Sequence, residues 1–414
     1  MASQQRFDLL ILVLLFFVLC PGAMAARDAG DPGSPVTVPD PALPFAVHSF
    51  IPGTNSIHSI QIMDLISAEN GDVLIATASG ISTYNGRWTT RAFKTDNYSQ
   101  GLYDNYVVAL EYDRDGNLWI GYANGLQIFD GQEYRLLRDQ QLLKDLRIID
   151  LQRWNDDMWV LTGNAGIHRY HEGNWTWYKP KSPGGPGFYT GRRMAIDSAD
   201  NSMLVATQGE GLWRVRQTHD AISFIQLQGN DDTYGNLNDV RRDPVGGAYF
   251  FNTKKVVHYD PVKGFSPVFP LNEGTVQPII NDIAAGPDGT LYIATNDGIW
   301  VLEDQKAVTH VGRFEGIGTS PIIKTINADA HNRIWFSTTD DVGFFTVDSG
   351  IRDQIPIDMA PTELTETPVP RAIPTLLQDA PDYPGTSPSK QPLSFIDTIL
   401  ESVSDFIKTA NPFR

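Results

Sequence analysis

The 414-residue sequence has one cysteine, little positive charge and almost no long apolar runs. The single cysteine, Cys20, lies in the apolar N-terminal segment, so no disulfide is expected in the rest of the chain. Asp and Glu (49) outnumber Lys and Arg (32), and the formal net charge of −17 argues against a nucleic-acid partner, which requires clustered Lys and Arg. With only 20% charged residues, this acidic balance is the kind that keeps a folded protein in solution.

The N-terminal segment has the layout of an export signal. Arg6 precedes an apolar run from Leu9 to Leu19, and Ala23-Met24-Ala25 supplies small residues at the cleavage positions. The run is about eleven residues long, which is too short to span a bilayer comfortably. We therefore predict a signal peptide over residues 1–25 and an exported protein that is extracellular, periplasmic or at the cell surface. No transmembrane helix is expected in the mature chain.

A repeat with a period of about 40–45 residues fills most of the remaining sequence. Its clearest copy is Asp-Gly-Asn-Leu-Trp-Ile-Gly-Tyr-Ala-Asn-Gly-Leu-Gln-Ile-Phe-Asp-Gly at residues 115–131. The other copies centre on Leu74, Trp159, Leu204, Tyr249, Tyr292 and Trp335. A fixed period of this size, with strand and turn patterns inside each copy, is typical of radial β-repeats.

Each copy is interpreted as four short strands between tight turns. In the second copy the predicted strands are 106–112, 118–122, 126–129 and 133–137, separated by turns rich in Gly, Asp and Asn. Seven such units with no helical stretch between them predict an all-β, seven-bladed propeller over residues 42–349. The large aromatic residues in the second strands are expected to fill the wedges between blades rather than to bind a ligand.

The two ends of the repeat region predict how the ring closes. The last unit offers three strand patterns and no fourth, while an additional strand pattern, Pro44–Phe50, precedes the first unit. We predict that this N-terminal strand closes the last blade as its outer strand, which also pairs an otherwise exposed edge. Residues 26–41, ahead of that strand, are expected to be disordered.

The pattern Gly-x-Leu-Trp-Ile-Gly-Thr-x-x-Gly-Leu-x-x-Tyr-Asp-Gly, clear at 71–86, 115–131 and 288–301, resembles the two-component-regulator propeller repeat. The resemblance covers residues 58–348. It implies a propeller like those in the periplasmic sensor regions of hybrid histidine kinases and in stand-alone secreted proteins. Since no kinase, receiver or DNA-binding pattern follows, we expect a stand-alone exported seven-bladed propeller without a kinase region, for which the resemblance suggests ligand sensing only loosely.

The C-terminal part has a different composition. Residues 350–393 are rich in Pro, Thr, Ser and acids, which predicts an extended linker. Residues 394–410 place apolar side chains at helical spacing, and Asn411-Pro412 ends the run, so an amphipathic helix is predicted. Its polar face carries Asp397, Glu401, Asp405 and Lys408. Three roles remain open for this helix: folding back onto the propeller, docking on a protein partner or a second copy, and lying on a membrane surface.

Ligands of propellers bind where loops converge over the central channel. Three connections stand out there by length and by their content of Tyr, Asn, Asp and Arg, namely 94–106, 179–193 and 228–238. Such side chains combine stacking with hydrogen bonding, so we predict a channel-mouth site for a small molecule, a glycan or a peptide. The candidate ligand-binding residues are Tyr103, Tyr106, Tyr189, Arg192, Arg193, Asn238, Asp282 and Lys324.

No catalytic residue, metal site or cofactor is predicted. The turn 113–117 begins like a calcium loop, but the sixth position is Leu118 instead of Gly and the twelfth is Asn124 instead of Glu. His168 and His171 are three apart in a predicted strand and therefore point to opposite faces. Signatures of a serine or cysteine nucleophile and of a phosphate-binding glycine loop are missing as well.

Three functions are compatible with these observations. The first is an exported, non-catalytic propeller that recognises a ligand or partner in an extracytoplasmic compartment. The second is an exported lyase or glycan hydrolase whose catalytic residues lie at the channel mouth, because fold alone does not exclude an enzyme. The third is a scaffold subunit of a cell-surface complex. We favour the first, since it accounts for the export signal, the linker and the helix together.

Overall fold

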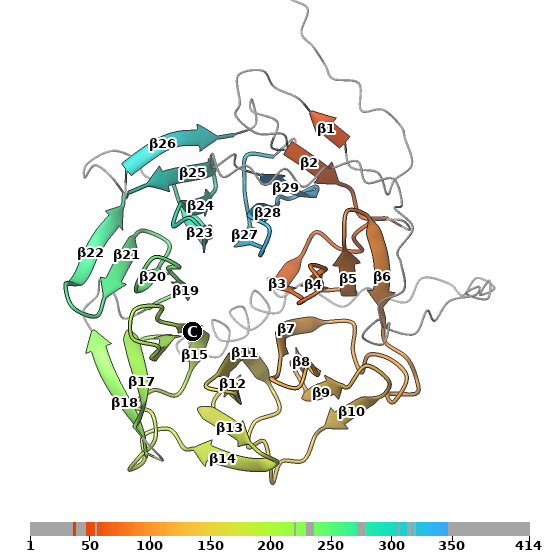
Figure 1. The fold of residues 1–414 in the computed structure, drawn as a ribbon, viewed down its shortest axis with the longest axis vertical. Coiled ribbons are helices and arrows are strands. Elements are labelled where there is room, and N and C mark those ends of the chain that lie inside the picture. Colours follow the sequence, from red (N-terminus) through yellow and green to blue (C-terminus); the bar gives the residue numbers. More distant parts are fainter. Residues whose placement is uncertain are drawn as a thin grey trace, which may run out of the picture. The chain divides into compact units, whose positions relative to one another are not determined.

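The computed structural model describes residues 36–38, 47–53, 56–218, 221–228, 236–270, 278–304, 306–312, 317 and 320–346. This part of the chain forms strands and turns without a helix, and its strands build seven sheets arranged as a ring (Figure 1). None of it is a helix that could cross a membrane. The predicted all-β, seven-bladed fold is confirmed.

Six blades consist of four consecutive antiparallel strands, numbered from the centre of the ring outward. Blades 1 to 3 are β3 Ile62–Ser67, β4 Val73–Thr77, β5 Gly80–Tyr84, β6 Trp88–Ala92; β7 Val107–Tyr112, β8 Leu118–Tyr122, β9 Gly125–Phe129, β10 Tyr134–Leu137; and β11 Ile148–Trp154, β12 Asp157–Thr162, β13 Ile167–His171, β14 Asn174–Tyr178. Blades 4 to 6 are β15 Gly191–Ile196, β16 Met203–Thr207, β17 Leu212–Thr218, β18 Ala221–Gln228; β19 Asp239–Arg242, β20 Ala248–Phe251, β21 Val256–Asp260, β22 Gly264–Phe269; and β23 Ile280–Ala285, β24 Leu291–Thr295, β25 Gly298–Glu303, β26 Lys306–Val311.

The seventh blade joins the two ends of the ring. Its inner strands are β27 Thr325–Ala328, β28 Arg333–Ser337 and β29 Val342–Thr346. The fourth strand is β2, Val47–Phe50, which pairs antiparallel with β29. This confirms the predicted closure by the N-terminal strand. A further strand, β1 Val36–Val38, pairs with β2 and lies within the segment 26–41 that the sequence predicts to be disordered.

Phe50 at the end of β2 connects the closing strand to the first blade. Its side chain is 1% exposed, and its ring centroid lies 5.2 Å from that of Trp88 and 6.3 Å from that of Trp335. Trp88 belongs to blade 1 and Trp335 to blade 7. The closing strand therefore contributes packing to both blades at the seam, in addition to its ladder of hydrogen bonds.

The turn between the first and second strands of blade 2 shows why the repeat carries its Asp-Gly-Asn-Leu-Trp pattern. Asp113 Oδ1 accepts hydrogen bonds from the backbone amides of Asp115 and Asn117, and its Oδ2 accepts from Trp119 Nε1 at 3.0 Å. Gly116 has a φ of +82°, which favours glycine. This carboxylate caps a turn and anchors the next strand's tryptophan, in agreement with the turn interpretation of 113–117.

The core lies in the wedges between neighbouring blades. Trp119 and Trp159 are fully buried, as predicted for the aromatic positions of the second strands. Leu74 of blade 1 belongs to the same buried cluster as Ile120 of blade 2. In contrast to this core, the predicted signal peptide 1–25, linker 350–393 and helix 394–410 lie outside the described residues.

Candidate functional site

The inner strands surround a cavity of about 340 Å³ at the centre of the ring, to which every blade contributes a side chain. The seven equivalent positions, one from each blade, are Met63, Val108, Ile149, Arg192, Asn238, Asn281 and Lys324. They lie 41–46 residues apart, which matches the repeat. We call this set the channel ring.

β-Bulges direct five members of the channel ring toward the cavity. The pairing of the first and second strands skips Met63, Val108, Ile149, Arg192 and Asn281, because the register shifts across each of them. A bulge leaves one residue without a ladder partner and changes the direction of its side chain. Here each bulged residue lines the channel cavity, while Met63, Val108 and Ile149 also pack against the core between blades.

The channel ring has two chemically different halves. Met63, Val108 and Ile149 come from the consecutive blades 1 to 3 and form an apolar wall, which we call the apolar half. Blades 4 to 7 contribute the polar half, which is made of Arg192, Asn238, Asn281 and Lys324. Figure 1 shows that the inner strands β3, β7 and β11 face β15, β19, β23 and β27 across the centre of the ring.

Most of the polar half is free to interact with a ligand. Within the described part of the chain, the side chains of Arg192, Asn238 and Lys324 make no hydrogen bond or ion pair, and all three residues are exposed. Asn281 is different, because its Nδ2 donates a hydrogen bond to the carbonyl of Ile323 at 2.7 Å. The polar half therefore offers a guanidinium, an ammonium and an amide that have no other partner.

One residue further along the inner strands, Arg193 holds a network of buried ion pairs. Its Nη2 lies 3.0 Å from Asp64 Oδ1, its Nη1 lies 3.2 Å from Asp150 Oδ1, and its Nε lies 3.7 Å from Asp239 Oδ2. Only 13% of the Arg193 side chain is exposed. Since Asp64 is on β3 and Arg193 is on β15, the guanidinium connects opposite sides of the ring (Figure 1).

Arg241 extends this network to a fourth carboxylate. Its Nη2 lies 2.9 Å from Asp239 Oδ2 and 3.2 Å from Asp282 Oδ1. The resulting channel network contains four aspartates and two arginines, so carboxylates exceed guanidiniums by two when all are ionised.

Three of these aspartates also bind their blade to the following one. Asp64 Oδ2 accepts a hydrogen bond from the amide of Leu110 at 2.9 Å, and Asp282 Oδ2 accepts one from the amide of Ile326 at 3.0 Å. Asp150 Oδ2 likewise accepts from the amide of Met194 at 2.6 Å. Each carboxylate thus satisfies a backbone donor of the following blade and an arginine, which fixes its position.

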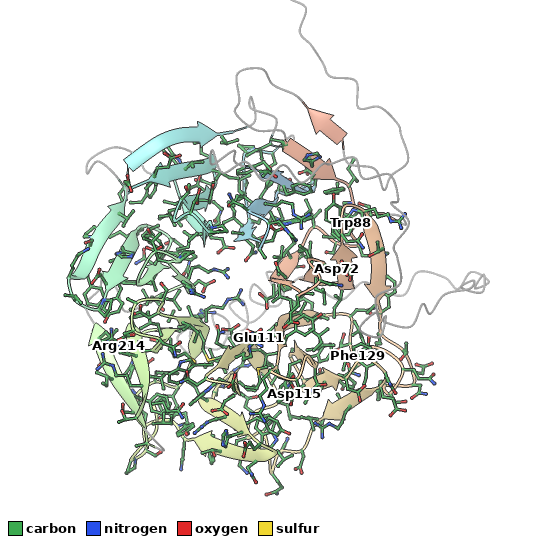
Figure 2. The ribbon with its side chains drawn as sticks, in the orientation of Figure 1. Asp72, Trp88, Glu111, Asp115, Phe129 and Arg214 are labelled. Atoms are coloured by element: carbon green, nitrogen blue, oxygen red, sulfur yellow. The ribbon has the colours of Figure 1, made fainter. Side chains whose placement is uncertain are left out.

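Burial changes the protonation of the network. It raises the pKa of Asp150 to about 7, although Arg193 acts in the opposite direction. Burial also raises the pKa of Glu111 to about 7. Glu111 lies beside the centre of the ring in Figure 2, whereas Trp88 and Phe129 lie further out in their blades. Two carboxyl groups near the channel therefore titrate close to neutral pH.

The guanidinium of Arg193 stays charged. Burial alone would lower its pKa, but the surrounding carboxylates raise that pKa well above its usual value. These carboxylates belong to Asp64, Asp150, Asp239 and Asp282.

The structure brings together five of the eight candidate residues and separates the other three. Arg192, Arg193, Asn238, Asp282 and Lys324 all line the channel cavity. Among them Arg193 and Asp282 are held in the channel network, while the remaining three project freely into the cavity.

The three candidate tyrosines lie outside this cavity lining. Tyr103 is buried and packs edge-on against Tyr98 and Tyr122, with ring centroids 5.1 and 5.8 Å away. Tyr106 precedes β7 and is 40% exposed. Tyr189 is 53% exposed, and Lys181 Nζ lies 5.7 Å from the centre of its ring.

Sequence reasoning missed several residues of the site. These are the apolar half of the channel ring together with Asn281, Asp64, Asp150 and Asp239. The sequence did contain a pattern that could have located the channel ring. Each member lies 10–12 positions before the residue on which its repeat copy is centred, as Val108 lies before Trp119. The network aspartates follow one position later in their blades.

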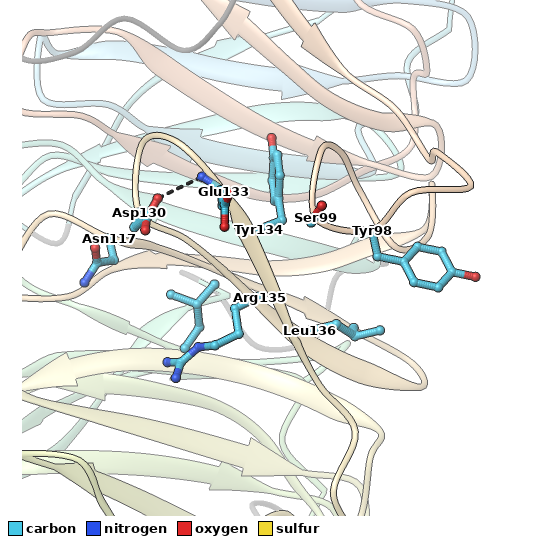
Figure 3. Close-up of a pocket in the computed structure, with 9 residues that line it drawn as sticks. Tyr98, Ser99, Asn117, Asp130, Glu133, Tyr134, Arg135 and Leu136 are labelled. Carbon is cyan, nitrogen blue, oxygen red and sulfur yellow. Dashed lines mark hydrogen bonds between the residues drawn. The ribbon is translucent and has the colours of Figure 1, made fainter.

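A second hollow, with a volume of about 680 Å³, lies at the outer edge of blade 2. Figure 3 shows it along β10, with Tyr134, Arg135 and Asp130 among its lining residues. Asp130 Oδ1 accepts hydrogen bonds from the amides of Gln132 and Glu133, and these bonds lower its pKa. Asp130 therefore caps the turn before β10, and the channel remains the better candidate site. Nowhere in the described residues is a cluster of His, Cys, Asp and Glu arranged to hold a metal ion.

Comparison with known families identifies the repeat. The family model described as the two-component regulator propeller matches residues 104–124, which include β7, the following turn and β8. Residues 104–124 carry a copy of the two-component regulator propeller repeat. A comparison with curated protein sequences found no match.

Solved structures similar to the chain are propellers of several kinds. One is an extracellular domain assigned to a hybrid two-component system of B. thetaiotaomicron, with a TM-score of 0.56, 16% identity, and coverage of 70% of this chain and 40% of that one. Streptogramin B lyase gives a TM-score of 0.55 at 15% identity and covers 73% of this chain and 98% of the lyase.

A third similar structure is PorZ, a surface component of the type-IX secretion system of Porphyromonas gingivalis. Its TM-score is 0.57 at 15% identity, with coverage of 74% of this chain and 49% of PorZ. The chain spans about two fifths of the two-component-system structures that it matches. At these identities the likeness establishes the propeller fold alone.

Proposed function

We propose that this chain is an exported recognition propeller that binds its ligand at the channel ring without catalysing a reaction. The observation that carries the proposal is the contrast between two adjacent layers of the channel. Among the described residues, the side chains of Arg192, Asn238 and Lys324 in the channel ring have no partner, whereas every aspartate and arginine of the channel network next to it takes part in an ion pair. Free polar groups that converge on a cavity of fixed shape are the usual features of a ligand site.

Export is supported by the sequence and by the similar structures. The segment 1–25 has the pattern of a signal peptide. Solved propellers of the same fold include extracellular domains assigned to one-component and hybrid two-component systems. In such proteins a propeller outside the membrane presents a rigid, preformed surface, and the same role suits this chain.

Recognition is favoured over catalysis because the channel aspartates are constrained. Asp64, Asp150 and Asp282 each pair with an arginine and accept a backbone hydrogen bond from the next blade. A catalytic carboxylate has to reach a substrate proton or carbon, and both oxygens of each of these carboxylates are already bound to an arginine or a backbone amide.

A lyase is the second candidate. It is favoured by the likeness to streptogramin B lyase over 98% of that protein and by the pKa of Glu111, which burial raises to about 7. A carboxyl group with a pKa near the working pH is suited to proton transfer. If the protein is a lyase, Glu111→Gln will abolish turnover of the substrate while leaving its binding unchanged.

The proposal is tested by a thermal-shift screen of the purified chain against organic acids, oligosaccharides, short peptides and nucleotides. A compound at 100 times its Kd stabilises the folded state by about 2.7 kcal/mol, which is readily measured. We expect a hit that the double substitution Arg192→Ala/Lys324→Ala removes. The control Lys254→Ala changes an exposed lysine in the turn between β20 and β21 and should retain it. A hit that survives the double substitution rejects the channel ring as the site, and a screen without any hit favours the scaffold function.

A further inference from the structure

We infer that the ligand of the channel ring is a small monocarboxylate with an apolar body. This inference rests on the proposed function and specifies the chemistry of its ligand. It is drawn from the arrangement of unpaired donors, apolar side chains and fixed carboxylates around one cavity, and from no property of the similar proteins.

The polar half of the channel ring is suited to an anion. Arg192 and Lys324 carry only hydrogen-bond donors, and neither has an acidic partner among the residues that the structure describes. The Arg192 guanidinium matches the two oxygens of a carboxylate, and the Lys324 ammonium adds a second charge-assisted bond. Asn238 contributes an amide that can donate to the same oxygens. A cation at this position would meet two like charges and would be repelled.

The channel network limits the charge of the ligand. Asp239 and Asp282 line the same cavity, and the network contains four carboxyl groups and two guanidiniums, so it keeps an excess of negative charge when Asp150 alone is protonated. A second negative group on the ligand would approach this excess of negative charge. One carboxylate placed against the polar half avoids the aspartates, so a ligand with a single negative charge fits best.

The apolar half defines the rest of the ligand. Met63, Val108 and Ile149 are partly buried side chains on the consecutive blades 1 to 3. Arg192 on blade 4 and Lys324 on blade 7 flank this apolar wall on its two sides (Figure 1). They offer no hydrogen bond to a hydroxyl-rich ligand such as a sugar, because their side chains are hydrocarbon or thioether. Each methylene group that such a wall buries strengthens binding about fourfold. The cavity of about 340 Å³ is at the lower end of the size range of small-molecule sites, which favours a compact body.

Isothermal titration calorimetry with four simple probes tests this ligand class on the purified chain. Octanoate has both the carboxylate and the apolar body, octanamide has the body without the charge, acetate has the charge without the body, and octylammonium reverses the charge. We expect octanoate to bind at least tenfold more tightly than octanamide. At about fourfold for each of its six additional methylene groups, it should bind on the order of a thousandfold more tightly than acetate. Octylammonium should not bind.

Substitutions locate the binding. Arg192→Gln and Lys324→Gln should each weaken octanoate at least fivefold and change octanamide by less than twofold, because only the charged group loses a partner. Lys254→Gln, the matched change of an exposed lysine outside the cavity lining, should leave octanoate within twofold. Both channel cations are exposed, so these variants are expected to fold, and circular dichroism checks that they do.

The outcomes separate this inference from the proposed function. The ligand class is wrong if octanamide binds as tightly as octanoate. It is also wrong if neither Arg192→Gln nor Lys324→Gln changes the affinity for octanoate. If none of the four probes binds while the thermal-shift screen gives a hit that Arg192→Ala/Lys324→Ala removes, the ligand class is wrong and the proposed function stands. If every hit of the screen survives that double substitution, the proposed function fails and this inference fails with it.

Discussion

Replacement of Arg193 by methionine tests whether the channel network stabilises the ring. Methionine keeps much of the side-chain volume and removes the charge, so Asp64, Asp150 and Asp239 each lose a cationic partner that now lies 3.0–3.7 Å away. Breaking a buried ion pair by removing one partner costs about 3–5 kcal/mol, because the remaining charge is left uncompensated. With about 2–4 °C per kcal/mol for a large domain, we expect the Tm at pH 8 to fall by about 6–20 °C.

The loss depends on pH in a defined direction. Burial already raises the pKa of Asp150 to about 7 in the presence of Arg193, and without the guanidinium the pKa of Asp150 will rise further. In the unfolded chain an aspartate has a pKa near 3.9. Between these values the native variant binds more protons than its unfolded state, so its stability increases as the pH falls. The difference from the wild type should therefore shrink to about half by pH 5.

Calorimetric melts of Arg193→Met at pH 5 and pH 8 measure this difference. The matched control is Arg192→Met, because the neighbouring arginine is exposed and has no ion pair among the described residues. We expect the control to change the free energy of unfolding by less than about 0.5 kcal/mol at either pH. Two outcomes would refute the claim that buried ion pairs of the network stabilise the ring. One is an equal loss of unfolding free energy for the two variants, and the other is a loss for Arg193→Met that is the same at both pH values.

Three further substitutions test the protonation, the closure and the blade packing. Burial raises the pKa of Glu111 to about 7, so its ionisation destabilises the native state by roughly 2 kcal/mol as the pH rises from about 5 to about 7. Glu111→Gln should reduce this dependence of stability on pH in denaturant titrations, and an unchanged dependence would contradict the assignment. Phe50→Ala should cost about 3–5 kcal/mol at the seam, whereas Ile51→Ala, at a side chain 48% exposed, should cost little; similar Tm values for the two would argue against closure by β2. A Cβ atom at Gly121 would lie 2.7 Å from Ile148 Cγ2 in the next blade, so Gly121→Val should lower the stability by about 1–3 kcal/mol, and a wild-type melt would disprove close packing there.

The fold could be predicted from the sequence because the apolar pattern within each repeat shows which strand is buried. The second strand of blade 2 was expected at 118–122 and is found there, since a strand covered on both faces must be apolar throughout. Closure was predictable for a related reason. The seventh unit lacks a fourth strand, and a complete blade needs one, so the pattern ending at Phe50 had a definite place to pair.

The site was only partly predictable, because its geometry depends on features that leave no local pattern. Arg193 and Asp64 form an ion pair across 129 positions of the sequence, and this contact exists only when seven blades close with β3 opposite β15. Long loops drew attention to tyrosines such as Tyr103, which is buried beside Tyr122 instead of lining the channel. Loop length shows which segments are long enough to form a binding site, whereas the bulges determine which side chains face the cavity.

Arg192 and Arg193 show how one repeat can provide stability and recognition at adjacent positions. They are the same residue type, yet the bulge in β15 turns Arg192 into the cavity and leaves Arg193 against the aspartates of three other blades. Asp64, Asp150 and Asp282 of the network layer each accept a hydrogen bond from an amide of the following blade, whereas the Arg192 side chain in the channel ring makes no such bond among the described residues. Substitutions in the channel ring should therefore change ligand preference at little cost in stability, and substitutions one position later should do the reverse. Separate measurement of Tm and ligand affinity for the two arginines decides whether this division of roles is real.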